Sequence, residues 1–279
     1  MENALITVLM TTFNEPVEYI QQSIESVLNQ TYANFELLIL DDSSNEDAIQ
    51  AIDSFKRDNR VSVVRDKQRM GFVNALNKGM KMAKGEYIAR MDADDICFND
   101  RFEKQINFMQ THSDVDILGG NMKIIDENGI VVSQRQYPCS KLSLKFSTIF
   151  RSPVAHPTVM FRRSIVEKNM FYDELFRKAE DLEFWLRLRN SGFRIANMPE
   201  YLLYFRISGD LAEKRNSEHF SYSFRARSKN FSWRYFYLDL PSILFAKLYS
   251  IVPSKITSIY YLNENKTTKN ETFELKRSK

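Results

Sequence analysis

The 279-residue sequence predicts an α/β protein, with a mostly parallel central sheet flanked by helices and a helical, basic C-terminal extension. Short apolar runs alternate with segments of helical periodicity through residues 5–118, which is the pattern of parallel strands joined by crossover helices. Several of these runs end abruptly in acidic or polar residues, at the strand ends where such sheets bind ligands. A hydrophobic fraction of 43% can fill a core of this size.

Five strands are predicted in the first part of the chain, each as a short apolar run. Their ranges are 5–10, 35–40, 61–64, 87–91 and 115–118. Helices are predicted between them, because apolar residues recur at three- and four-residue spacing within 20–28, 49–55, 73–83 and 102–109. Gly85 follows the third helix as a stop signal.

The second part of the chain is less regular. The pattern predicts a hairpin at 124–132 around Asn128-Gly129, mixed strand and loop at 146–161, a helix at 182–188 and a strand at 201–207. Helices rich in aromatic and basic residues follow from about residue 213. We therefore predict a first domain at 1–212 with halves of about 1–120 and 121–212, a helical extension at 213–262, and a disordered tail at 263–279.

Charge is distributed unevenly along the chain. The net charge is +3, but residues 214–279 hold 13 Lys or Arg against 5 Asp or Glu, a balance of +8 that leaves −5 for residues 1–213. The basic, aromatic end is typical of contact with an anionic surface, or of a solvated terminus. The net charge is too small to indicate nucleic acid.

Compartment and membrane topology follow from what the sequence contains. Cys97 and Cys139 form neither a metal spacing nor a disulfide framework, which favours a reducing compartment. No secretory signal is evident, and the apolar stretch 236–252 is too short and too polar to span a bilayer. We expect a cytoplasmic protein that can lie on the inner face of the cell membrane.

Three carboxylates, those of Asp92, Asp94 and Asp95, come directly after the fourth predicted strand. Mg²⁺ and Mn²⁺ prefer oxygen ligands, typically one or two carboxylates together with substrate phosphates. Such an ion could neutralise charge on a departing diphosphate. The alternative is that this Asp-rich turn is solvated and only caps a helix.

Two further acidic pairs stand at the ends of predicted elements. Asp41 and Asp42 follow the second strand and could accept hydrogen bonds from a ribose or a base, or cap the next helix. Glu180 and Asp181 open the helix at 182–188, where a carboxylate can serve as a general base or simply favour the first helical turn.

Other candidates carry weaker signals. His156 is a lone histidine, which is more often structural than a ligand. Lys67 and Arg69 precede Gly71 and either touch a diphosphate or are solvated loop cations. The sequence contains no GxGxxG or GxxxxGK motif and no Ser/His/Asp signature, which argues against dinucleotide, P-loop and hydrolase sites.

Taken together, these segments resemble family 2 glycosyltransferases with the GT-A fold, from about Leu5 to Arg206. The resemblance rests on Thr11-Thr12-Phe13-Asn14-Glu15, the segment at 74–79, the DxD-like region at 85–95, and Glu180-Asp181 followed by Trp185-Leu186-Arg187-Leu188. It implies a nucleotide-binding half at about 1–120 and an acceptor half at about 121–212. It also implies roles for individual residues. Nucleotide binding falls to Thr11, Phe13, Glu15, Asp42, Asn74 and Asp92, metal binding to Asp92 and Asp94, and the catalytic base to Asp181. Diphosphate or acceptor contacts fall to Lys67, Arg69, Asp95, His156 and Glu180.

Two segments depart from the family pattern. Tyr204-Phe205-Arg206-Ile207-Ser208-Gly209 lacks the histidine that often follows the acidic helix, and the segment near Gly71 lacks an arginine that some members place on the diphosphate. A metal contact from the first segment is therefore not expected. Arg69 or Lys67 would have to serve in the second.

The resemblance implies a metal-dependent inverting hexosyltransferase that uses Mn²⁺ or Mg²⁺ and a nucleoside-diphosphate sugar, with UDP-hexose as the expected donor. The expected acceptor is a glycan hydroxyl, on a lipid-diphosphate-linked intermediate of O-antigen or capsule synthesis. The basic extension would add a peripheral contact with an anionic membrane. The alternatives are a sugar-phosphate nucleotidyltransferase and a non-catalytic nucleotide-sugar-binding module. The loop at 11–16 lacks the glycine and arginine of the former, and the latter would not need Glu180-Asp181.

Overall fold

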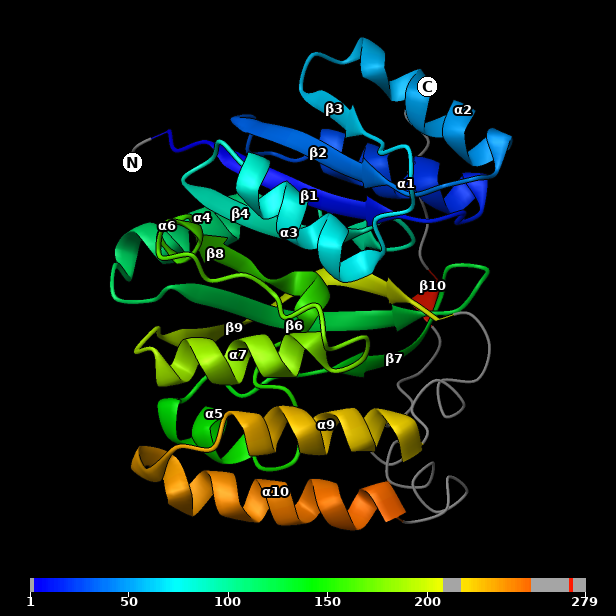
Figure 1. The fold of residues 1–279 in the computed structure, drawn as a ribbon. Coiled ribbons are helices and arrows are strands. Elements are labelled where there is room, and N and C mark those ends of the chain that lie inside the picture. Colours follow the sequence, from blue (N-terminus) through cyan, green and yellow to red (C-terminus); the bar gives the residue numbers. More distant parts are fainter. Residues whose placement is uncertain (1–2, 208–216, 252–270, 273–279) are drawn as a thin grey trace.

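The computed structural model describes residues 3–207, 217–251 and 271–272. A ten-stranded mixed sheet runs through the molecule in the order β10-β7-β6-β8-β4-β1-β2-β3, with β9 paired to β5 and β6. Helices cover both faces, and α9 and α10 lie at the end of the molecule opposite β3 (Figure 1).

One half of the sheet is parallel. Its strands are β1 (Ile6–Thr12), β2 (Phe35–Asp41), β3 (Val61–Val64) and β4 (Tyr87–Asp92), in the order β4-β1-β2-β3. They are connected by α1 (Val17–Leu28), α2 (Glu46–Ser54), a 3₁₀ turn at Phe55–Arg57 and α3 (Phe72–Met82). Every residue of β1 is buried, as expected for a central strand covered on both faces. The four strands predicted at 5–10, 35–40, 61–64 and 87–91 are confirmed.

The other half of the sheet mixes parallel and antiparallel pairs. It contains β5 (Ile96–Cys97), β6 (Ile117–Ile125), β7 (Ile130–Arg135), β8 (Met160–Arg162), β9 (Ile195–Arg206) and β10 (Glu271–Thr272). β8 lies antiparallel between β4 and β6, while β9 runs parallel to β6. β6 and β7 form the predicted hairpin, in which Gly129 takes a φ of 80° that an L-residue avoids.

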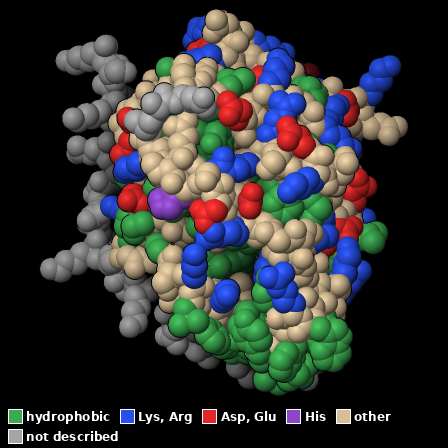
Figure 2. All heavy atoms as spheres, turned by 90° about the vertical axis from the view of Figure 1, so that its left-hand side faces the viewer, with side chains coloured by type: hydrophobic (Ala, Val, Ile, Leu, Met, Phe, Trp, Pro, Cys, Tyr) green, Lys and Arg blue, Asp and Glu red, His purple; other side chains and the backbone are tan. Residues whose placement is uncertain are grey.

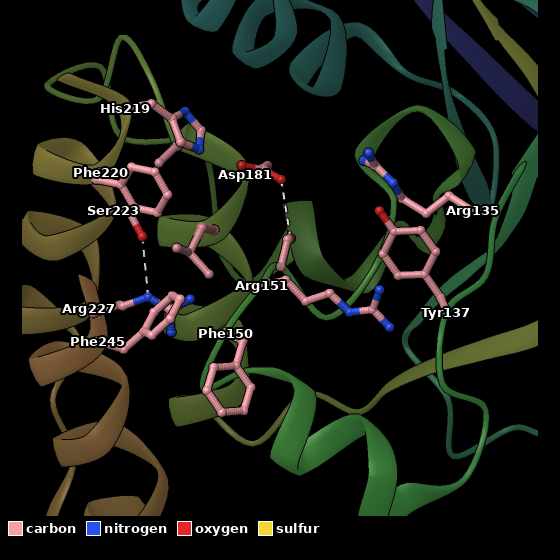
Figure 3. Close-up of a pocket in the computed structure, with 13 residues that line it drawn as sticks. Arg135, Tyr137, Phe150, Arg151, Asp181, His219, Phe220, Ser223, Arg227 and Phe245 are labelled. Carbon is pink, nitrogen blue, oxygen red and sulfur yellow. Dashed lines mark hydrogen bonds between the residues drawn. The ribbon is translucent and has the colours of Figure 1, made fainter. Parts of the chain in front are cut away.

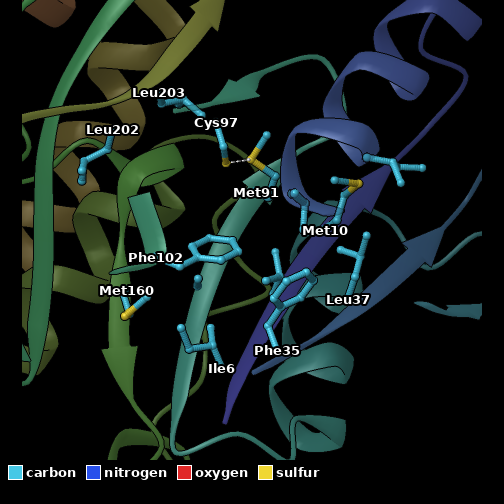
Figure 4. Packing of buried hydrophobic residues seen from close by; sticks show 14 of the residues in the cluster. Ile6, Met10, Phe35, Leu37, Met91, Cys97, Phe102, Met160, Leu202 and Leu203 are labelled. Atoms are coloured by element: carbon cyan, nitrogen blue, oxygen red, sulfur yellow. Dashed lines mark hydrogen bonds between the residues drawn. The ribbon is translucent and has the colours of Figure 1, made fainter. Parts of the chain in front are cut away.

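Side chains of the central strands alternate between two core layers. Ile6 and Met10 of β1 pack with Phe35, Met91 and others on one face (Figure 4). Leu9 packs on the other face with residues of α3 and α7. α3 approaches β1 so closely at Gly79 that a Cβ there would lie 2.1 Å from Leu9 Cδ1. The sheet is therefore buried on both faces, and its strand ends are the natural place for a site.

The remaining helices pack against the two faces of the sheet or lie beyond β7. They are α4 (Arg101–Thr111), α5 (Lys141–Ser147), α6 (Ser164–Glu167), α7 (Glu180–Asn190), α9 (Ser217–Lys229) and α10 (Phe236–Ile251), with 3₁₀ turns at His156–Thr158 and Trp233–Tyr235. Ala226 of α9 packs against Leu182 and Leu186 of α7. An ion pair of 2.9 Å joins Arg189 of α7 to Asp239 of α10. Among the described helices, none combines the length and apolarity needed to cross a membrane.

The structure refines several sequence predictions. The segment 146–161 is the end of α5, a loop and a 3₁₀ turn, with β8 beginning only at Met160. The strand predicted at 115–118 begins at Ile117 and continues to Ile125. The predicted disordered tail at 263–279 lies outside the described residues, apart from Glu271–Thr272 beside β7. The proposed division at residues 212 and 262 stays a prediction.

Candidate active site

Three polar loops meet at one edge of the parallel half, because β1, β2 and β4 are adjacent and end together. Thr12 of β1 is in register with Asp41 of β2, and Thr11 with Asp92 of β4. Their loops enclose a cavity, here called the strand-end cavity. It is lined by Thr11, Thr12, Phe13, Glu15, Leu40, Asp42, Arg69, Phe72, Ala75, Asp92, Ala93 and Asp94. The loops predicted to converge do so.

The loop after β1 is held in shape by its own side chains. The Glu15 carboxylate accepts hydrogen bonds from Thr12 Oγ1 at 2.5 Å and from the Phe13 N–H at 2.7 Å. Asn14 adopts a left-handed φ of 59°, and its side-chain oxygen accepts the N–H groups of Ser44 and Asn45. This arrangement leaves Phe13 40% exposed, and the Arg69 guanidinium lies 3.5 Å from its ring centroid. Arg69 therefore lines the strand-end cavity, and its predicted contact with a diphosphate stays a prediction.

The carboxylates after β2 tie this edge to the loop before α3. Asp41 is buried and pairs with Arg65 at 2.5 Å. Asp42 accepts the N–H of Met70 at 2.9 Å through one oxygen and the N–H of Gly71 at 2.7 Å through the other. Asp42 thus fixes the loop that carries Arg69, while its side chain still lines the cavity. Its predicted contact with the base stays a prediction.

Asp92, Asp94 and Asp95 bring one oxygen each to within 4.8 Å of one another. Arg90 donates to Asp92, and the Arg206 N–H donates to Asp95 at 2.9 Å. Among the described residues, no donor reaches the buried Asp95 Oδ2. Desolvation and the neighbouring carboxylates raise the pKa of Asp94 to about 7 and that of Asp95 well above its usual value. This crowding of hard oxygen donors fits a divalent cation, which would offset the repulsion.

Glu180 and Asp181 form the first turn of α7, after Ala179 at a left-handed φ of 55°. Such a conformation in a residue with a side chain is strained and is frequent at functional sites. Ser152 Oγ donates to Asp181 Oδ2 at 3.2 Å. Desolvation, and then the charge of Asp181, raise the pKa of Glu180 to about 8, with a smaller contribution from Asp92. The acidic end of β4 and the start of α7 are therefore close enough to interact.

Asp181 faces a second cavity, here called the Asp181 cavity, between the C-terminal helices and the segments after β7 and α5. Figure 3 shows Phe220, Arg227 and Phe245 on one side of it, Arg135 and Tyr137 on the other, and Asp181 between them. The complete lining is Arg135, Tyr137, Phe150, Arg151, Ser152, Ala179, Asp181, Leu182, His219, Phe220, Ser223, Arg227 and Phe245. Most of the side chains that line the Asp181 cavity are cationic or aromatic.

Arg90, His156 and Tyr172 are buried at the centre of this region. The pKa of Glu180 and that of Asp94 both respond to the charge of Arg90. His156 Nε2 and the Tyr172 hydroxyl share a hydrogen bond of 2.8 Å, and desolvation lowers the pKa of His156 well below its usual value. The imidazole is therefore neutral, and it packs edge-on against Phe72.

The predicted site residues fall into three groups. Those on the strand-end cavity are Thr11, Phe13, Glu15, Asp42, Arg69, Asp92 and Asp94. Asp181 lines the other cavity. The rest line neither one: Asn74 donates to the Met70 carbonyl, Lys67 is exposed, Asp95 and His156 are buried, and Glu180 opens α7 beside Asp181.

Sequence reasoning missed Arg90, Arg151 and Ser152. A signal existed for Arg90, because a charged residue inside the apolar run Tyr87–Met91 must find a buried partner. No local signal marks Arg151 or Ser152, since their place beside Asp181 depends on how the loop after α5 meets α7.

Comparison with known proteins decides the family. Residues 7–170 match the family model described as glycosyl transferase family 2. The chain belongs to this family. The O-antigen biosynthesis glycosyltransferase WbnJ of Escherichia coli is 34% identical over 229 residues, which cover 79% of this chain and 88% of WbnJ.

Two solved structures share the fold of this family 2 glycosyltransferase. The S. aureus TarS 1–349 complex with UDP-GlcNAc aligns with a TM-score of 0.65 at 18% identity, over 86% of this chain and 71% of TarS. The mannosyltransferase PcManGT from Pyrobaculum calidifontis, in complex with GDP-Man and Mn²⁺, gives 0.65 at 16% identity, over 93% and 73%. The predicted GT-A fold is confirmed.

Proposed function

We propose that this glycosyltransferase is a metal-dependent inverting hexosyltransferase, moving a sugar from a UDP-hexose to a hydroxyl of a lipid-diphosphate-linked glycan. One observation carries the proposal. The acidic end of β4 and the acidic start of α7 lie close together but face two different cavities: His156 packs against Phe72 of the strand-end cavity and lies 5.8 Å, ring to ring, from Trp185 of α7, and the charge of Asp92 adds to the raised pKa of Glu180. That arrangement suits a donor on one side of the reacting carbon and a base on the other.

The strand-end cavity would take the nucleotide. Phe13 offers a partly exposed ring for the base, with Thr11, Glu15 and Asp42 around it and Asn74 on the adjoining turn of α3. Arg69 already lies over the Phe13 ring, so it is placed to shift toward a diphosphate without any backbone rearrangement. The UDP-GlcNAc and GDP-Man complexes of the two structural neighbours support a nucleoside-diphosphate sugar as donor.

Asp92 and Asp94 would hold Mn²⁺ or Mg²⁺, and Mn²⁺ in PcManGT supports that choice. The ion would supply charge neutralisation for the diphosphate as it leaves. Arg90 stabilises the carboxylate of Asp92 from behind. Asp95 sits deeper and is held by the backbone of Arg206, which makes it a support for the loop.

Asp181 would remove the proton of the acceptor hydroxyl. The hydroxyl oxygen then attacks the anomeric carbon from the face opposite the diphosphate, the bond from that carbon to the diphosphate oxygen breaks, and the electron pair leaves with UDP. A single displacement of this kind inverts the anomeric configuration, through an oxocarbenium-like state. The Ser152 hydroxyl orients the carboxylate of Asp181 by its hydrogen bond.

The acceptor would enter through the Asp181 cavity. Its Arg151 and Arg135 suit an anionic acceptor, and its Phe220 and Phe245 suit an apolar or sugar-stacking group. The name of WbnJ supports an acceptor in surface polysaccharide synthesis, such as O-antigen or capsule. Such an enzyme would work in the cytoplasm, at the inner face of the cell membrane.

The decisive test is a screen of nucleotide sugars against a lipid-diphosphate glycan, with Mn²⁺, with Mg²⁺ and with EDTA. We expect turnover with one UDP-hexose, dependent on metal, and a product whose anomeric proton coupling shows inversion. Binding of the donor without its hydrolysis and without transfer to any acceptor would favour a binding module instead. Release of pyrophosphate from a sugar phosphate and UTP would favour a nucleotidyltransferase.

A further inference from the structure

The outer surface of α10 is apolar, although it faces away from the rest of the protein. Its large exposed hydrophobic residues, with those of the turn before it, are Trp233, Phe236, Tyr237, Leu240, Leu244 and Leu248, here called the α10 face. Trp233 is 82% exposed and Leu244 is 60% exposed. The four-residue spacing from Phe236 to Leu248 places these side chains in one stripe along the helix.

The inner surface of the same helix is partly polar. Asp239 and Ser242 are buried toward the protein with Leu238 and Ala246, and Asp239 pairs with Arg189 of α7. The polarity of α10 is thus reversed relative to that of an ordinary surface helix, whose polar residues face solvent. An apolar stripe of this length on an outer surface indicates a binding partner.

The sequence around the α10 face is strongly basic. Segments 133–151 and 219–251 contain the cations Arg135, Lys141, Lys145, Arg151, Arg225, Arg227, Lys229, Arg234 and Lys247. Their only acidic residue is the buried Asp239. Figure 2 shows hydrophobic side chains gathered at the lower end of the molecule, beneath a band of Lys and Arg side chains. Apolar groups bordered by cations are the pattern of an interfacial helix on anionic lipid.

The neighbouring helix α5 extends this surface and connects it to the catalytic region. Leu142 and Phe146 of α5 and Phe150 just after it, four residues apart, are all exposed, and α5 and α10 border a common cavity lined by both apolar and basic side chains. Phe150 packs edge-on against Phe245 of α10, with ring centroids 5.3 Å apart. The same two rings line the Asp181 cavity. Apolar side chains therefore connect the end of the molecule with Asp181.

We propose that the α10 face docks on an anionic lipid bilayer, with α10 lying in the plane of the headgroups. The inference deepens the proposed function and rests on it for its purpose, because docking would bring the Asp181 cavity to the level of a lipid-linked acceptor. A second copy of the chain fits less well, since two-fold pairing of this surface would bring two sets of the same cations, Lys141, Lys145 and Arg234, to one interface.

Vesicle sedimentation with the full chain tests the docking directly, without donor or acceptor. Wild type should sediment with phosphatidylcholine vesicles that contain phosphatidylglycerol. The variant Leu240→Ser/Leu244→Ser/Leu248→Ser should lower the partition coefficient by at least roughly 100-fold, because three leucines lose their apolar burial in lipid. The matched control Met82→Ser/Leu175→Ser replaces exposed hydrophobic residues outside α5 and α10 and should partition as wild type does.

A charge variant separates the two contributions. Lys141→Gln/Lys145→Gln should weaken binding to anionic vesicles roughly 10-fold at low salt, and should leave binding to pure phosphatidylcholine unchanged. Wild-type sedimentation by the triple serine variant would overturn the proposal. So would a wild-type dimer in light scattering that the serine variant converts to monomer while neither protein binds vesicles.

Activity is read separately, so that failure of docking and failure of the proposed function can be told apart. Turnover of a water-soluble acceptor should be the same for wild type and the triple serine variant, which also shows that the variant is folded. Docking without turnover of any donor would reject the proposed function and keep this inference. Turnover of the soluble acceptor without docking would do the reverse.

Discussion

The strand-end cavity and the Asp181 cavity have opposite chemistry. The strand-end cavity is built from parallel strand ends and carries Glu15, Asp42, Asp92 and Asp94. The Asp181 cavity is built from helices and connecting loops, and apart from Asp181 its charged side chains are cationic. The difference suits the proposed function, in which the first cavity would bind its anion through a cation that its carboxylates hold, and the second would bind its anion through arginine side chains.

Replacement of the proposed base is expected to have the largest effect. Asp181→Asn should lower kcat by roughly 10²- to 10⁴-fold, because the acceptor hydroxyl loses its proton acceptor. Titration calorimetry should find UDP affinity unchanged, since Asp181 lines only the second cavity. Glu46→Gln, an exposed carboxylate on α2, is the matched control. Normal turnover by Asp181→Asn would break the comparison by removing the base from that cavity.

Disruption of the proposed metal site should have the next-largest effect. Asp94→Asn should lower kcat/KM by roughly 10²-fold, because charge on the leaving diphosphate is less well neutralised. In the wild type, EDTA should weaken UDP binding, and added Mn²⁺ should restore it. Asp47→Asn, at an exposed position on α2, should behave as wild type. Equal UDP affinity with and without metal would show that the acidic cavity binds its anion in another way.

The cationic cavity can be tested through Arg151. Arg151→Gln should raise KM for a lipid-diphosphate acceptor about 10-fold, the loss expected for one charge-assisted hydrogen bond, and should leave KM for the donor unchanged. Steady-state kinetics with each substrate varied in turn measures both constants. Arg57→Gln, at an exposed position after α2, is the control. A change confined to the donor KM would show that Arg151 contacts the donor and not the acceptor.

The smallest expected effect is on stability, through Glu180. Its folded pKa of about 8 lies above the ordinary 4.5, so the folded metal-free protein binds the extra proton between these values and loses stability as pH rises through them. Glu180→Gln cannot ionise. It should therefore be more stable than wild type at pH 8, by on the order of 1–2 kcal/mol, and equal to it near pH 4.5. Urea unfolding across this range measures the difference; parallel curves would show that Glu180 is not desolvated.

The strand-end cavity could be predicted from sequence because the residues that form it are marked by local sequence patterns. Each strand of the parallel half is a short apolar run, and Asp42, Asp92 and Asp94 follow those runs directly, so topology alone brings them together. The Asp181 cavity could not be predicted in this way. Arg227 is 76 residues beyond Arg151, and Arg135, Arg151 and Arg227 line one cavity only because α9 packs on α7 and the loop after α5 brings Ser152 to Asp181.

The mixed strand and loop predicted at 146–161 is only partly right, because the segment begins in α5 and its strand starts only at Met160. The run at 146–161 contains Ile149, Val154 and Val159, which favour strands, but Ser140 caps α5 by accepting the Ser143 N–H and the helix continues to Ser147. His156 was ambiguous in sequence for the same reason. Only the neighbouring Tyr172 and Phe72 identify it as a neutral, packed ring.

Arg206, at the end of β9, stabilises the acidic loop that follows β4. Its N–H donates to Asp95, its guanidinium donates to the Asp94 carbonyl at 3.0 Å and to Gln22 at 2.6 Å, and it lies over the Tyr19 ring. The contact with Asp95 joins residues 111 positions apart. During synthesis, the parallel half of the sheet can therefore fold early. The acidic loop after β4 gains its final shape only after β9 has left the ribosome. Nascent chains that stop before β9 should have a sheet but no ordered cation site.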